Sequence, residues 1–264
     1  MRRRLAVTGL AVLACTAFAT ASCAAKPTPS ATPTATPKPA TQVLTDAVAK
    51  TKGQSFKYTV KYGTVLTADG AQDETGANAT RNISYTDAAS GLVIKGQVTL
   101  AANVIYAKLD LGPLTAAIPG LAGANGKSLK IDRAKIGTTG LAASLVPGGD
   151  SNLPETYVNG VVSAQNVSAT EIKGTIDLTK SAPKVIPASE LTKLSAESKT
   201  VPFTATLDSQ GRIAKITITL PAISVFPAAD LTTTYSDYGT PVSIVAPAPA
   251  DTVVAPDLIY QFLK

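Results

Sequence analysis

Apolar and polar residues alternate strictly in several short segments of the chain. In residues 56–62, FKYTVKY, aromatic or apolar residues occupy every second position, and lysine and threonine occupy the others. This period of two is typical of a β-strand with one buried face. Segments of the same kind predict strands at 81–86, 91–101, 104–109, 171–178, 201–207, 213–220 and 231–238. Their close spacing predicts antiparallel meanders, and DSQG at 208–211 predicts a hairpin turn with Gly211 in the left-handed conformation.

A helical period precedes and separates these strands. In residues 41–52, TQVLTDAVAKTK, the apolar residues share one helical face, and Gly53 follows as a stop signal. The sequence NLPE at 152–155 resembles a capping box with proline in the first turn and predicts a helix to about Ala164. Residues 136–146 and 188–196 could form further short helices. The order of meander, helical segment and meander predicts an α+β fold, with one antiparallel sheet and helices on one of its faces.

The N-terminus has the layout of a bacterial lipoprotein export signal. Three arginines precede an uncharged apolar run of about 17 residues, and small residues lead to Cys23. We expect cleavage of residues 1–22 and lipidation of Cys23, which would anchor the protein to the extracytoplasmic face of the cell membrane. Cys15 is a competing lipidation site, and a signal anchor is an alternative to cleavage. Since cleavage leaves Cys23 as the one cysteine, no internal disulfide is expected.

Residues 23–40 form a predicted tether. Proline recurs every few positions in PTPSATPTATPKPA, which favours an extended polyproline-type segment. No later proline-rich tract divides residues 41–264, and their length suits one domain. Of 24 basic residues, the three early arginines leave with the signal, so 21 face 18 acidic residues. This small and scattered excess excludes a nucleic-acid footprint.

The sequence offers little catalytic chemistry. It contains no histidine, which removes the most common general base and a frequent metal ligand. Residues 181–184, SAPK, formally match S-x-x-K, but the proline opposes the helical turn that this motif needs. We therefore expect no catalytic residues, no metal and no cofactor, and an enzyme using Asp/Glu or Ser/Lys is the least favoured hypothesis.

The second half of the chain carries a family resemblance. Residues 169–183, ATEIKGTIDLTKSAP, are followed by VPFTATLDSQGRIAKITITLP at 201–221 and DLTTTYSDYGTPVSIVAP at 230–247. This series resembles the actinobacterial lipoproteins of the LppX/LprAFG family and, more broadly, lipoprotein carriers with a LolA-like fold. The resemblance implies an open half-barrel, in which a curved antiparallel sheet has helices covering its concave face around an apolar cavity.

The function implied by this resemblance is lipid handling without catalysis. The protein would bind an acylated lipid or glycolipid in the cavity and carry or present it within the cell envelope, with an envelope lipid transporter as a candidate partner. The cavity candidates are Phe56, Tyr58, Val60, Ile94, Val98, Ile176 and Phe203. The Gly/Ala-rich span 112–146 is a candidate lid. The alternative is a surface or signalling lipoprotein that binds a protein partner and has a filled core.

Overall fold

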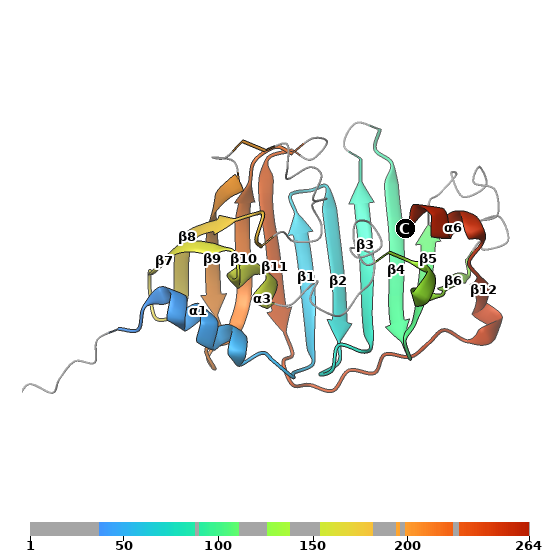
Figure 1. Ribbon diagram of the computed structural model, residues 1–264, viewed down its shortest axis with the longest axis horizontal. Coiled ribbons are helices and arrows are strands. Elements are labelled where there is room, and N and C mark those ends of the chain that lie inside the picture. Colours follow the sequence, from blue (N-terminus) through green and yellow to red (C-terminus); the bar gives the residue numbers. More distant parts are fainter. Residues whose placement is uncertain are drawn as a thin grey trace, which may run out of the picture. The chain divides into compact units, whose positions relative to one another are not determined.

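A computed structural model of the chain describes residues 37–87, 90–110, 126–137, 154–181, 194–195, 199–223 and 227–263 (Figure 1). The chain divides into two compact units, Met1–Pro37 and Lys38–Lys264, and the described helices and strands all belong to the second unit. The predicted export signal, Cys15 and Cys23 lie outside the described residues. Among the residues that are described, no helix has the length and apolar composition needed to cross a membrane.

One sheet of twelve strands dominates the described part of the chain. The strand order is β12-β6-β5-β4-β3-β2-β1-β11-β10-β9-β8-β7, and neighbouring strands are antiparallel except for the parallel pair β12–β6. The strands are β1 (Phe56–Tyr62), β2 (Leu66–Gln72), β3 (Ala79–Thr86), β4 (Val93–Ala101), β5 (Val104–Asp110), β6 (Ser128–Ile131), β7 (Val161–Asn166), β8 (Glu171–Asp177), β9 (Thr200–Leu207), β10 (Ile213–Leu220), β11 (Ala229–Ser236) and β12 (Thr252–Val254).

The helices of the described residues are short. They are α1 (Ala40–Ala49), α3 (Pro154–Val158) and α6 (Asp257–Phe262), with 3-10 turns η3 (Arg133–Lys135) and η5 (Pro249–Asp251). The predicted fold class, an α+β half-barrel whose helices cover the concave face around an apolar cavity, is therefore wrong. The described chain is mainly a large open antiparallel sheet, and its few helical turns are too short to form a covering layer.

The predicted helix to Ala164 shows how the helical content was overestimated. A helix does start at Pro154, within the predicted range, but it ends at Val158, and the rest of the predicted capping sequence, Asn152 and Leu153, lies outside the described residues. Gly160 then lies against Ser181, where an added Cβ would be 2.3 Å from the serine Cβ. The following residues, with two β-branched valines at their start, pair with β8 as strand β7. Tertiary pairing therefore overrides the helical pattern from Val161 onward.

Alternation predicts the buried face correctly where the side chains are large. In β1 every second residue is buried, from Phe56 to Tyr62. The register carries this face, here called the inner face, across the sheet. On it, α1 packs against β7 and β10, and Tyr157 of α3 contacts Thr233 of β11. The buried side of α1, which includes Leu44 and Val48, follows the predicted helical period.

Two apolar clusters lie on the inner face. The first core contains α1, α3, β1 and β8–β11, with Leu44, Phe56 and Ile218 fully buried. The second core joins β4, β5 and β6 to α6 through residues such as Leu100 and Tyr260. Figure 1 shows α1 and α3 in front of one half of the sheet and α6 beside β5 and β6. Strands β2 and β3 lie between the two cores.

Candidate functional surfaces

The predicted cavity residues all lie on the inner face, but six of them divide between two clusters and the seventh belongs to neither. The first core holds Phe56, Tyr58, Val60, Ile176 and Phe203, and each is at most 5% exposed. The second core holds Val98, whereas Ile94 is half-buried and belongs to neither cluster. The alternation reveals which face is buried, but it does not show whether a helix, another part of the chain or a ligand covers that face. In the structure, six of the seven candidates are packed core residues.

Only part of the predicted lid lies within the described residues. Of the span 112–146, the structure describes residues 126–137. These residues form β6, which pairs with β5 and β12 inside the sheet, and the turn η3. This part of the span belongs to the sheet. Its remaining residues, and nearly all of the possible helices at 136–146 and 188–196, lie outside the described ranges.

A strip of half-buried to exposed apolar residues lies on the inner face between the two cores, and its Ala68 packs against the first core. The register aligns Val60 with Ala68, Ile83, Gly96 and Leu109 across five neighbouring strands. We define the inner strip as Ala68, Ile83, Ile94, Gly96 and Leu109. Ile83, Ile94 and Leu109 belong to neither core, and Leu109 is 36% exposed. The described helices pack on either side of this strip (Figure 1).

A buried guanidinium lies next to the inner strip. Arg81 is the one charged side chain that is buried in the described part of the chain, and its Nε donates to the Tyr58 hydroxyl at 3.0 Å. Gly70, which lies between these residues in the register, makes room for the tyrosine ring. Burial raises the pKa of Tyr58, although the adjacent positive charge of Arg81 opposes this shift. The phenol therefore stays protonated at neutral pH.

Further tyrosines fix α3 against the sheet. The hydroxyl of Tyr157 on α3 lies 2.9 Å from the hydroxyl of Thr233 on β11, and both side chains are buried. Burial raises the pKa of Tyr157 and raises that of Tyr235 well above its usual value. The Tyr235 ring meets Phe56 edge-on, with centroids 5.8 Å apart. These neutral phenols pack in the core, and none has the lowered pKa of an activated base.

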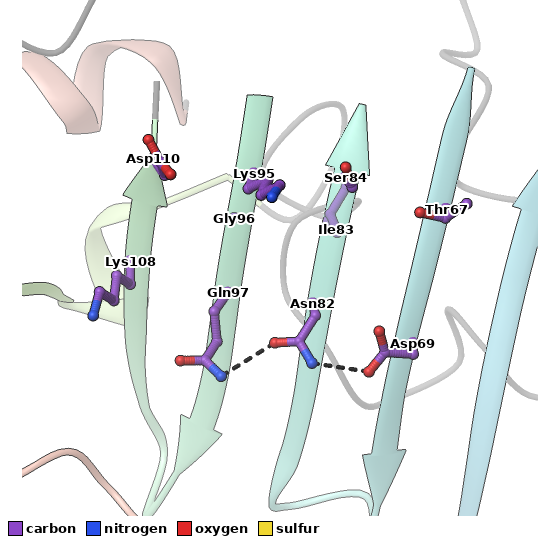
Figure 2. A pocket seen from close by; sticks show the side chains of 10 residues that line it. All are labelled: Thr67, Asp69, Asn82, Ile83, Ser84, Lys95, Gly96, Gln97, Lys108 and Asp110. Carbon is purple, nitrogen blue, oxygen red and sulfur yellow. Dashed lines mark hydrogen bonds between the residues drawn. The ribbon is translucent and has the colours of Figure 1, made fainter. Parts of the chain in front are cut away.

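The opposite face of the sheet, here called the outer face, carries a polar ladder. Asn82 donates from Nδ2 to Asp69 at 2.8 Å, and Gln97 donates from Nε2 to the Asn82 Oδ1 at 3.1 Å. Figure 2 shows these three side chains side by side on β2, β3 and β4. The next row is Thr67, Ser84, Lys95 and Asp110, also in register. Together with Ile83, Gly96 and Lys108 these residues line a shallow depression of about 360 Å³.

A second depression of about 570 Å³ lies beside the first on the outer face. It shares Gln97 and Lys108 with the first depression, and its floor adds Thr80, Thr99 and Ser128. One wall is the segment Ser243–Pro247, here called the C-terminal strap, which belongs to the connection from β11 to β12. In Figure 1 this connection runs past the ends of the central strands.

Sequence reasoning missed the two adjoining depressions, which are together called the outer groove. Its residues come from strands whose polar positions look like ordinary solvated side chains, and only the register brings Asp69, Asn82 and Gln97 together. Among the described residues, no group of three or more His, Cys, Asp or Glu side chains could hold a metal ion. Comparisons of the sequence with family models and with curated proteins found no match.

Proposed function

We propose that this protein is a non-catalytic lipid-binding protein that holds an acyl chain against the inner strip of its sheet. The observation that carries this proposal is the row of half-buried apolar side chains between two packed cores, where the described helices do not pack. This location differs from the enclosed cavity of a half-barrel. The acyl chain would lie along the inner face, between the two cores.

The side chains of the strip suit a flexible hydrocarbon. Ile83, Ile94 and Leu109 offer branched apolar surface, while Ala68 and Gly96 bring the surface close to the backbone level. An acyl chain that buries six methylenes here would gain about 5 kcal/mol before ordering losses. This gross gain is enough for measurable binding, and longer contact along β2–β5 would increase it.

The N-terminal sequence supports a location for this activity at the membrane. The predicted lipid on Cys23 would hold the domain at the extracytoplasmic face of the membrane, and the proline-rich tether would let it reach the bilayer surface. An acylated lipid or glycolipid is the expected ligand, and an envelope lipid transporter is the expected partner.

The test fills the strip without disturbing the fold. A Cβ on Gly96 would lie 3.5 Å from the Leu109 Cδ2, which is an ordinary contact, so Gly96→Leu can start a new side chain over the strip without a backbone clash at Cβ. Uptake of a fluorescent long-chain fatty acid by the full chain should weaken about tenfold or more, because the new side chain displaces two or more methylenes. The urea midpoint should stay unchanged or rise, since leaving glycine favours a strand.

The matched control is Thr217→Leu, which adds the same side chain on the outer face of β10. It should leave fatty-acid uptake within about twofold of the wild type. Equal loss in both variants, or no loss in Gly96→Leu, would contradict binding at the inner strip. If the wild type takes up no acyl probe and purifies without lipid, the lipid proposal fails. The alternative of a lipoprotein with a protein partner would then be preferred.

A further inference from the structure

The outer groove is a second candidate site, on the face opposite to the inner strip, and it does not depend on lipid binding. Its floor is built from fixed polar groups. The ladder from Asp69 through Asn82 to Gln97 holds both amides in place, with donor–acceptor distances of 2.8 and 3.1 Å. A side-chain amide has two N–H donors and a carbonyl that can accept two hydrogen bonds. The ladder uses one donor of each amide and the carbonyl of Asn82 (Figure 2), so each amide keeps further hydrogen-bonding capacity for a ligand.

The floor continues into the second depression without leaving the outer face. Gln97 and Lys108 line both depressions, so the two volumes of about 360 and 570 Å³ form one groove. The hydroxyl groups of Thr80 and Thr99 lie 3.5 Å apart within it and add further donors and acceptors. Both volumes fall in the range of about 300–1,000 Å³ that is usual for ligand sites.

One wall of this groove is apolar. The C-terminal strap contributes Ile244, Val245 and Pro247, and Val245 is 74% exposed. A groove with a hydrogen-bonding floor and an aliphatic wall fits a ligand that has both hydroxyl groups and C–H surfaces. A large exposed aliphatic side chain beside a polar floor has no role in the cores described above, but it would contact such a ligand.

The charges of the groove decide between ligand classes. The first depression has Asp69 and Asp110 against Lys95 and Lys108, and the second adds Asp251, so positive charge is not in excess. This balance gives no attraction for a nucleic acid or an anionic polymer. The backbones of β3 and β4 are already paired on both sides, so a peptide cannot add to them as a strand.

From these observations we infer that the outer groove binds an uncharged carbohydrate. Its hydroxyl groups would both donate to and accept from Asn82, Gln97 and the threonines, and its C–H surface would lie against Val245 of the strap. An extended chain of several sugars would run along the groove from the first depression to the second. The site would thus recognise a glycan on the face opposite to the proposed lipid site.

The test uses the full-length protein and isothermal titration with three neutral hexasaccharides, made of α-linked glucose, β-linked glucose and mannose. At least one should bind with a Kd of about 1 mM or tighter. Gln97→Ala should weaken that binding about five- to tenfold, because it removes a floor amide shared by both depressions. Val245→Ser should weaken it too, through loss of the apolar wall.

The control is Thr204→Ala, a truncation on the same outer face but on β9, away from the groove. It should leave the affinity within about twofold, and thermal unfolding should show that all three variants fold. The inference is overturned if none of the hexasaccharides binds or if Gln97→Ala and Thr204→Ala have equal effects. Tighter binding of an anionic hyaluronan hexasaccharide, or of a neutral Gly/Ser hexapeptide, would also overturn it. Fatty-acid uptake, measured in parallel, should be unchanged in Gln97→Ala.

Discussion

Gly70→Ala should destabilise this protein more than its single added methyl group suggests. A Cβ on Gly70 would lie 2.2 Å from the carbonyl oxygen of Thr80 and 2.6 Å from the hydroxyl oxygen of Tyr58. Both distances are far shorter than a carbon–oxygen contact allows. Either β2 and β3 must separate locally, or the tyrosine ring must leave its position. In the second case the hydrogen bond from Arg81 to Tyr58, 3.0 Å long, is lost.

The expected magnitude combines three contributions. Overpacking costs about 1–3 kcal/mol, and loss of a hydrogen bond to a buried charged group costs about 1.5–3 kcal/mol. Replacing glycine also stabilises the folded state by about 0.4–1 kcal/mol, because it lowers the conformational entropy of the unfolded chain. Since the two costs share one cause, they do not add fully, and we expect a net loss of about 2–4 kcal/mol in the free energy of unfolding.

The assay is urea unfolding followed by far-ultraviolet circular dichroism, with Gly96→Ala as the matched control. Gly96 lies on the same face two strands away, and its added Cβ would be 3.5 Å from the nearest side-chain atom. That variant should be as stable as the wild type or slightly more stable. If the two variants differ by less than about 0.5 kcal/mol, the reasoning is refuted.

A double-mutant cycle separates the two clashes. In a Tyr58→Leu background the ring and its hydroxyl are gone, and only the contact with the Thr80 carbonyl remains. The cost of Gly70→Ala should therefore fall in that background by about 1–2 kcal/mol. An unchanged cost would mean that the backbone contact alone determines the effect.

Three further predictions concern other parts of the chain. The pKa of Asp208 is lowered: partial burial would raise it, but hydrogen bonds from the backbone N–H groups of Arg212 and Gln210 and from the Arg212 guanidinium outweigh burial. The carboxylate therefore stabilises the folded state above about pH 4, and this stabilisation is lost as the pH falls through the lowered pKa. Asp208→Asn should thus cost about 1 kcal/mol at pH 7, and chemical unfolding should show a smaller difference from the wild type in acid, whereas a constant difference would contradict this. A double-mutant cycle of Tyr157→Phe and Thr233→Val should give a coupling of about 1 kcal/mol, and a value near zero would show that their 2.9 Å contact is not stabilising. Cys23→Ser should release the protein from membranes on cell fractionation, while continued lipid labelling would point to Cys15.

Side-chain size explains which strands could be predicted from the sequence. In β1 and β10 the inner positions carry large apolar residues, so the alternation is obvious. Strand β2 is LTADGAQ, and its inner positions hold Leu66, Ala68, Gly70 and Gln72. These residues give little apolar signal, because the strand lies beneath the Tyr58 ring and keeps small residues there. A strand whose neighbour supplies the bulk is difficult to recognise from its own sequence.

The two candidate surfaces differ in the same way. The inner face was predictable because burial selects apolar residues, although the sequence could not show that its candidates divide between two cores. The outer groove depends on register, since Asp69, Asn82 and Gln97 meet only when β2, β3 and β4 are aligned. Periodicity contains no information about register between strands. The groove also needs the strap, which lies far along the chain from β3 and β4.

The place of β1 in the strand order has a consequence for the order of folding. Neighbours within β1–β6 and within β7–β11 are consecutive in the chain, so each run can form from local contacts. The pairing of β1 with β11 joins opposite ends of the domain and requires a long loop to close. We expect it to form last. During synthesis one edge of β1 stays unpaired until β11 has been made, so the sheet is incomplete until nearly the whole chain is present. On the predicted export route, this delay would keep the chain incompletely folded, and therefore able to cross the membrane, until its C-terminal strands have been made.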